Sequence, residues 1–207
     1  MLDKRLILWT VAMGLAGVVT TPGAAETTRA AAASRAEAGP PLEQTREGVR
    51  VAGNLVPGST LIRGYAPYAG DPTAVRGEDR AGNRATVVRF FALPIGAGRA
   101  RLYATDGVKQ LPALGIQWPG LDAQLRNNEQ NRGRYPGWKW SDVVIWNTDD
   151  PTVFWVEASG ATAPGAEPAY ANHYVMQFVV RGGRIVLFRE FGAPVRMTPV
   201  TDHEGTQ

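Results

Sequence analysis

Three polar side chains interrupt otherwise apolar runs near the C-terminal end of the chain: His173, Gln177 and Glu190. The dipeptide Gly182-Gly183 lies between the two runs, and paired glycines in that setting predict a tight hairpin turn. Counting outward from this turn places Glu190 opposite Val175, and alternation along paired strands then puts the three polar groups on one face. We therefore predict that His173, Gln177 and Glu190 converge within an apolar surface.

The chemistry of this cluster depends on the carboxyl group. A carboxyl on an apolar surface can act as a general acid or base near neutral pH, which would make Glu190 the catalytic residue. His173 and Gln177 would then orient a bound substrate. A second interpretation is that Glu190 pairs with an arginine to satisfy a buried charge, and that His173 is a structural hydrogen-bonding residue at a strand end. The sequence leaves both interpretations open.

The composition excludes several other kinds of site. The 207 residues include no cysteine and two histidines, so a thiolate nucleophile, a disulfide framework and a cysteine zinc site are ruled out. Zinc or copper would depend on His173 and His203 together with carboxylates, and we predict no metal site. The excess of 22 Lys+Arg over 19 Asp+Glu is slight, so we expect no nucleic-acid partner.

Tryptophans are concentrated in the region before the hairpin. Trp138 and Trp140 are spaced to share one face of a strand, and Trp155 follows in the next apolar run. Aromatic side chains dominate the burial energy of protein cores, so these rings could fill a core or form the wall of a pocket for a ring-shaped ligand. If the rings form the wall of a pocket, Trp138, Trp140 and Trp155 are candidate substrate-binding residues.

The elements that must position these side chains follow from periodicity and turn residues. Because both faces of the hairpin are largely apolar, we expect helices to cover one face of the sheet and a partner subunit to cover the other. Asn83 is the expected N-cap of the first helix. The predicted strands are 141–147, 152–158, 172–180 and 184–191, and the predicted helices are 83–91 and 121–131.

The N-terminus resembles an export signal. Lys4 and Arg5 precede an apolar run over residues 6–19, and small residues follow to Ala25, where cleavage is expected. The alternative is an uncleaved membrane anchor, although the run is shorter than a spanning helix needs. We therefore expect a periplasmic or secreted protein that contacts a membrane only through an uncleaved signal.

The chain divides into four parts around one compact domain. The composition between the signal and the first helix predicts a linker and a poorly structured arm with one or two short strands. The expected parts are a signal peptide at 1–25, the linker and arm at 26–82, the compact domain at 83–197 and a flexible tail at 198–207.

Several strings in the compact domain resemble the PhzA/PhzB phenazine-biosynthesis family in order and approximate spacing. They are Tyr135-Pro136-Gly137-Trp138-Lys139-Trp140, Thr148-Asp149-Asp150-Pro151 followed by Phe154-Trp155-Val156-Glu157, Asn172-His173-Tyr174, Gly183-Arg184-Ile185 and Arg189-Glu190-Phe191. The resemblance implies an α+β fold, an NTF2-like cone related to ketosteroid isomerase and SnoaL-like proteins. In it, a curved, mostly antiparallel sheet and N-terminal helices enclose a pocket, and the protein forms a homodimer.

The resemblance also implies an activity. Members of the family are thought to condense two aminocyclohexenone carboxylate molecules without a metal or organic cofactor, and the glutamate of the R-E-F motif is Glu190 here. The family's histidine and serine fall on Asn127 and Asn131, which we include among the candidate substrate-binding residues. Two functions follow: a cofactor-free enzyme for a small cyclic, phenazine-precursor-like substrate, or an exported, non-catalytic NTF2-like module that binds a small molecule.

Overall fold

The computed structural model describes residues 41–63 and 77–192 of the chain. The predicted export signal at 1–25 and the predicted tail at 198–207 lie outside these residues. Within the two described ranges, no helix is long and apolar enough to cross a membrane.

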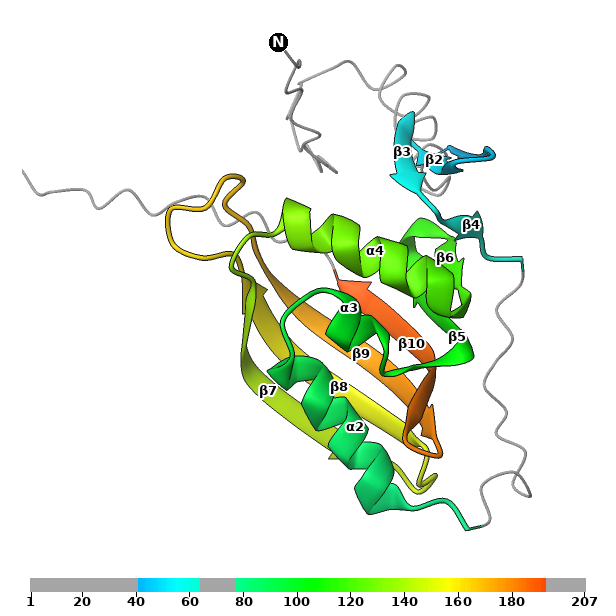
Figure 1. The fold of residues 1–207 in the computed structure, drawn as a ribbon, viewed down its shortest axis with the longest axis vertical. Coiled ribbons are helices and arrows are strands. Elements are labelled where there is room, and N and C mark those ends of the chain that lie inside the picture. The colour runs from blue at the N-terminus through cyan, green and yellow to red at the C-terminus, as the bar shows by residue number, and fades with distance from the viewer. Residues whose placement is uncertain (1–40, 64–76, 193–207) are drawn as a thin grey trace, which may run out of the picture.

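A seven-stranded sheet organises the fold, with the strand order β4-β6-β5-β10-β9-β8-β7. All neighbouring pairs are antiparallel except β5 and β10, which run parallel. In Figure 1 the helices α2, α3 and α4 lie across one face of this sheet, here called the inner face; the opposite one is the outer face. The strands are β4 (Thr60–Leu61), β5 (Tyr103–Leu111), β6 (Ile116–Pro119), β7 (Lys139–Asn147), β8 (Val153–Ala161), β9 (Ala171–Arg181) and β10 (Arg184–Gly192).

The four predicted strands are confirmed as β7 to β10, with ends that differ by a few residues. Strands β5 and β6 were not expected, because polar and turn residues interrupt their apolar pattern. Gly107 shows how β5 fits beside β10: a Cβ there would lie 2.5 Å from the carbonyl oxygen of Ile185. The close approach of two backbones therefore requires glycine at this point.

The helices follow the sequence signals with one correction. Helix α2 (Arg80–Ala92) begins before Asn83, and its N-cap is Asp79, whose side chain accepts a hydrogen bond from the Ala81 amide at 2.9 Å. Asn83 is buried instead and serves a different purpose, described below. Helix α4 (Gly120–Arg134) contains the predicted helix 121–131, and the short helix α3 (Ala97–Ala100) lies in a segment for which no element was predicted.

The arm before α2 contains more regular structure than expected. Strands β1 (Leu42–Gln44), β2 (Gly48–Val51) and β3 (Asn54–Pro57) form a small antiparallel sheet, and β4 joins the edge of the main sheet at β6. Val49 and Val51 are buried in a cluster with Ile116, Trp118 and Ala123. The arm is therefore packed onto the domain beside β6 and α4.

The main core lies between α2 and the inner face. Val87 and Phe90 project from α2 onto the inner-face residues of β8, β9 and β10, which are fully or almost fully buried. These strand residues are Phe154, Val156, Ala158, Tyr174, Met176, Phe178, Val180, Ile185 and Phe188. The core therefore fixes which side chains of each strand point toward the helices.

Candidate active site on the inner face

A β-bulge at Val186 determines where Glu190 points. Val180 lies opposite Ile185, as predicted, but the register then shifts, so that Glu190 lies opposite Met176 rather than Val175. One extra residue in a strand moves every later side chain to the other face. Glu190 therefore shares the inner face with Met176, and the predicted convergence with His173 and Gln177 is wrong.

Lys109 is the charged partner of Glu190. Strand β5 places Lys109 opposite Phe188, so its side chain also lies on the inner face. Its Nζ is 3.4 Å from Glu190 Oε2 and lies over the rings of Trp118 and Phe188, at 5.3 and 5.7 Å from their centres. The Lys109 and Glu190 side chains are 13% and 22% exposed, so the ion pair is largely buried but still reached by solvent.

Arg99 adds a second cation to this region. Its side chain is 4% exposed and donates two hydrogen bonds to the Leu93 carbonyl oxygen, and its guanidinium lies over Phe90, 4.9 Å from the ring centre. Burial lowers the pKa of Arg99 to about 10, while Tyr103 and Glu190 act in the opposite direction. Among residues 41–63 and 77–192, no carboxylate lies within ion-pair distance of Arg99.

The charge of Glu190 affects several buried tyrosines. Burial raises the pKa of Tyr103 and of Tyr174 above the usual range, and the negative charge of Glu190 raises both further. Tyr170 is affected by the same two causes, burial first. The charge of Glu190 therefore acts on several buried hydroxyls on the inner face of the sheet.

Trp138 and Trp140 extend this region as an aromatic wall. The Trp140 ring contacts Tyr174 edge to face, with centres 5.2 Å apart, and Trp138 contacts Trp140 in the same way at 5.2 Å. Both indole Nε1 atoms are buried without a hydrogen-bond partner in the described part of the chain. The rings pack against the main core, and their N–H groups could bind an acceptor atom of a ligand.

Helix α4 places Asn127 and Asn131 on the same side of the sheet. Asn127 is buried, and its Oδ1 accepts a hydrogen bond from Asn131 Nδ2 at 3.3 Å. These amides can donate and accept hydrogen bonds but cannot exchange a proton near neutral pH. Any proton transfer on this face must therefore use other groups.

The remaining predicted site residues lie on the outer face. His173 is exposed, and its Nδ1 is 3.2 Å from Ser159 Oγ. Gln177 Oε1 accepts a hydrogen bond from Arg189 Nη1 at 3.1 Å, and the Trp155 ring stacks near Phe191 with centres 5.9 Å apart. The sheet itself separates these three side chains from Glu190.

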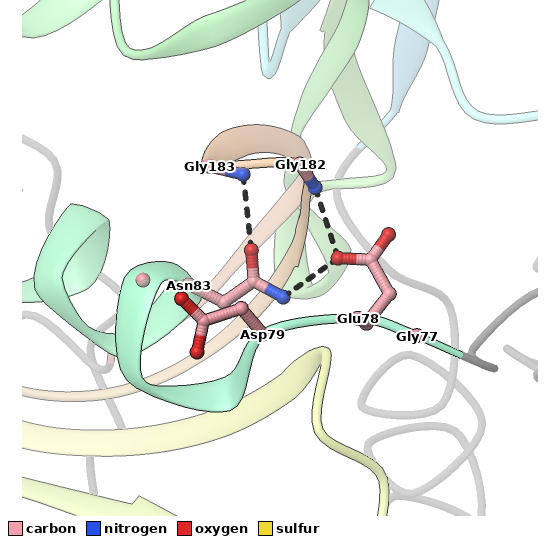
Figure 2. A pocket seen from close by; sticks show the side chains of 7 residues that line it. Gly77, Glu78, Asp79, Asn83, Gly182 and Gly183 are labelled. Carbon is pink, nitrogen blue, oxygen red and sulfur yellow. Dashed lines mark hydrogen bonds between the residues drawn. The ribbon is translucent and has the colours of Figure 1, made fainter.

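A hollow of about 380 Å³ lies at the opposite end of β10, where the hairpin turn meets α2 (Figure 2). Its polar groups are already paired: Asn83 Oδ1 accepts from the Gly183 amide, and Glu78 Oε2 accepts from the Gly182 amide and from Asn83 Nδ2, each at 3.0 Å. Figure 2 shows these bonds linking the helix to the turn. The hollow therefore has a structural explanation and is not the candidate site.

The inner-face groups together suit acid and base chemistry on an anion. Arg99, Lys109 and Glu190, here called the inner cluster, comprise two cations and one carboxylate, which favours a ligand with a negative charge. Aromatic rings beside the cluster would contact a flat ligand. In the described residues, no group of three His, Asp or Glu side chains could hold a metal ion.

Local sequence patterns do not point to two members of the inner cluster. Lys109 follows Gly107 in a segment without clear strand periodicity, and Arg99 follows a Gly-Ala-Gly string that is typical of a loop. The parallel pairing of β5 with β10 brings Lys109 to Glu190, and such pairing between distant segments is not visible in local patterns.

Comparisons with known proteins point to one family. Residues 65–200 match the family described as phenazine biosynthesis protein A/B. Phenazine biosynthesis protein PhzA1 of Pseudomonas aeruginosa is 35% identical over 125 residues, covering 55% of this chain and 76% of that protein. PhzB1 of the same organism is 34% identical over 125 residues, with the same coverage of 55% and 76%.

A solved structure supports the same assignment. The crystal structure of a phenazine biosynthesis-related protein (phzb2) from Pseudomonas aeruginosa superimposes with a TM-score of 0.50 and 28% identity, covering 62% of this chain and 94% of that chain. The expected α+β fold of the NTF2-like class, with a curved and mostly antiparallel sheet, is confirmed. Because the match spans most of the chain, this protein belongs to the phenazine biosynthesis protein A/B family.

Proposed function

We propose that this protein is a cofactor-free enzyme that condenses small cyclic carboxylates of the phenazine-precursor type, with Glu190 as its general acid or base. The observation that carries this proposal is the position of Glu190 on the inner face, 3.4 Å from Lys109 and beside an aromatic wall. A carboxylate in this setting can accept a proton from a substrate held against the rings.

Two further features support a substrate that carries a carboxylate. Arg99 is buried and lacks an ion-pair partner within the described ranges, so an incoming anion would supply the missing countercharge. The unpaired Nε1 atoms of Trp138 and Trp140 would donate to acceptor atoms of the ligand, and the Trp140 ring lies beside Arg99, with its centre 5.9 Å from the guanidinium carbon.

The test is a Glu190→Gln substitution, with Glu47→Gln as the matched control because Glu47 is exposed between β1 and β2, away from the outer face. The purified proteins are incubated with an aminocyclohexenone carboxylate, and formation of the tricyclic product is followed by absorbance and mass. Glu190→Gln should lower the rate by about 100-fold or more, whereas Glu47→Gln should leave it unchanged. A wild-type rate no greater than the buffer rate contradicts the proposal.

The second candidate is a non-catalytic module that binds the same class of small molecule. The paired amides of Asn127 and Asn131 favour it, because they stand where the resemblance implies a histidine and a serine. Native mass spectrometry separates the two functions. A binding module retains an unchanged cyclic ligand, whereas an enzyme releases a condensed product.

We also propose that the protein acts as a homodimer whose outer faces meet. Trp146 is 55% exposed on this face, and Val144, Val175 and Phe191 are exposed nearby. Apolar side chains gathered on one face of a sheet favour a second protein layer over water.

Export is the last part of the proposal. It depends on Lys4, Arg5 and the apolar run at 6–19, and these features fit a signal that is cleaved near Ala25. The intact mass of the protein isolated from its own host tests it. A mature chain that begins at Glu26 agrees with export, and a chain that retains Met1 in the cytoplasmic fraction contradicts it.

A further inference from the structure

We propose that Lys109 is the proton donor of this site and works with Glu190 as an acid and base couple. The proposal rests on the condensing activity proposed above and adds a catalytic residue to it. It also accounts for proton exchange on a face where Asn127 and Asn131 offer amides only.

The contacts of Lys109 are those of an ammonium group. Its Nζ lies 3.4 Å from Glu190 Oε2 and over the faces of Trp118 and Phe188, and both a carboxylate and an aromatic face stabilise a cation. A protonated amine is a donor and not a nucleophile, so these contacts favour proton donation over covalent attack on a substrate.

The backbone holds the two groups at a fixed distance. Lys109 lies opposite Phe188 in the parallel pair β5 and β10, and Glu190 lies two residues farther along β10 on the same face. The other titratable groups on which the charge of Glu190 acts are Arg99 on α3, Tyr103 on β5, Tyr135 at the end of α4, Tyr170 just before β9 and Tyr174 on β9. The side chains that α4 buries are uncharged: Ala123, Gln124, Asn127 and Asn128.

The proposed step joins the amine of one substrate molecule to the ketone of another. The nitrogen attacks the carbonyl carbon, a C–N bond forms and the C=O π bond breaks. Lys109 gives a proton to the carbonyl oxygen, and Glu190 takes a proton from the nitrogen, which yields a carbinolamine. The proton then passes from Glu190 to Lys109 across their contact, so the couple is restored without an oxidant, a reductant or a cofactor.

The experiment compares Lys109→Met, which keeps most of the length of the side chain, with Lys109→Arg, which keeps a cation that does not release its proton near neutral pH. Arg84→Met is the control because Arg84 is exposed on α2, away from the outer face. With an aminocyclohexenone carboxylate, Lys109→Met and Lys109→Arg should each lower kcat/KM by about 100-fold. Arg84→Met should match wild type.

The pH profile of Lys109→Arg distinguishes proton donation from a role that needs only a positive charge. The fall of kcat/KM at alkaline pH in wild type should be absent from the low residual activity of Lys109→Arg, because a guanidinium keeps its proton throughout this range. A Lys109→Arg variant with the rate and alkaline fall of wild type overturns the proposal, and this comparison remains available if Lys109→Met does not fold.

Two other outcomes also overturn it. If wild type condenses the substrate and Lys109→Met does so equally well, Lys109 has no catalytic role and the proposed function stands. If wild type is inactive, the proposed function fails and the role of Lys109 fails with it. Incubation of wild type with the substrate and cyanoborohydride should leave Lys109 unmodified; a reduced adduct on Lys109 would identify a nucleophile and contradict proton donation.

Discussion

Glu190 and Met176 are cross-strand partners in the β9 and β10 pair, and both side chains lie on the inner face. Arg189 and Gln177, the adjacent partners, lie on the outer face and are joined by a hydrogen bond of 3.1 Å. Neighbouring residues of one strand therefore contribute to two different surfaces.

The two surfaces differ in chemistry. The inner face combines an ion pair, a buried arginine and aromatic rings. The outer face carries a row of amides, in which Gln110 accepts from Arg189 Nε and donates to Gln117. These amides already have hydrogen-bond partners on neighbouring strands. The exposed apolar side chains beside them are therefore the groups that would contact another protein.

The link between α2 and the hairpin turn predicts a stability effect. Asn83 is 1% exposed, and Asn83→Ala removes the acceptor for the Gly183 amide and the donor to Glu78. We expect the free energy of unfolding in urea to fall by about 1–3 kcal/mol. Arg84→Ala, on the exposed side of the same helix, should change it by less than about 0.5 kcal/mol. Equal unfolding midpoints for the two variants would contradict this account.

Local patterns predicted much of the fold. Period-two alternation located β7 to β10, and the paired glycines located the turn between the last two strands. These signals work because each depends on residues close together in sequence. For the same reason the 3.6-residue pattern located α4.

The register beyond Val186 could not be predicted in this way. The interval from Ile185 to Leu187 is irregular against both β9 and β5, so the bulge involves three strands at once. A uniform count from the turn assigns Glu190 to the wrong face because it assumes an unbroken ladder. Lys109 reaches Glu190 through the pairing of β5 with β10. Local patterns do not show pairing between segments so far apart in sequence, so Lys109 was not predicted.

The exposed apolar side chains of the outer face predict how the protein assembles. Replacing Trp146 with glutamate puts a charge where a dimer would exclude water, so Trp146→Glu should shift the protein to monomers at micromolar concentration. Arg84→Glu, on the exposed side of α2, should leave the dimer intact. Sedimentation velocity measures both, and a monomeric wild type would rule out the proposed dimer.

The buried tyrosines predict a loss of stability at alkaline pH. Burial, and then the charge of Glu190, raise the pKa of Tyr103 and Tyr174 above the usual value of 10.0, and burial also raises that of Tyr135 and Tyr170. The unfolded chain therefore releases these protons first, so stability is fully present below about pH 10 and falls as the pH rises above it.

Arg99 opposes this trend but does not reverse it. Its pKa is lowered to about 10 by burial, so the folded chain loses that proton at a lower pH than the unfolded chain does. The titration of Arg99 alone therefore raises the free energy of unfolding as the pH rises above about 10. Four tyrosines outweigh one arginine. Tyr103→Phe removes one titrating group and should flatten the decline by up to about 1.4 kcal/mol per pH unit, with little change at pH 7. Urea unfolding between pH 7 and pH 11 measures the slope, and identical slopes for wild type and Tyr103→Phe would show that Tyr103 ionises normally in the folded protein.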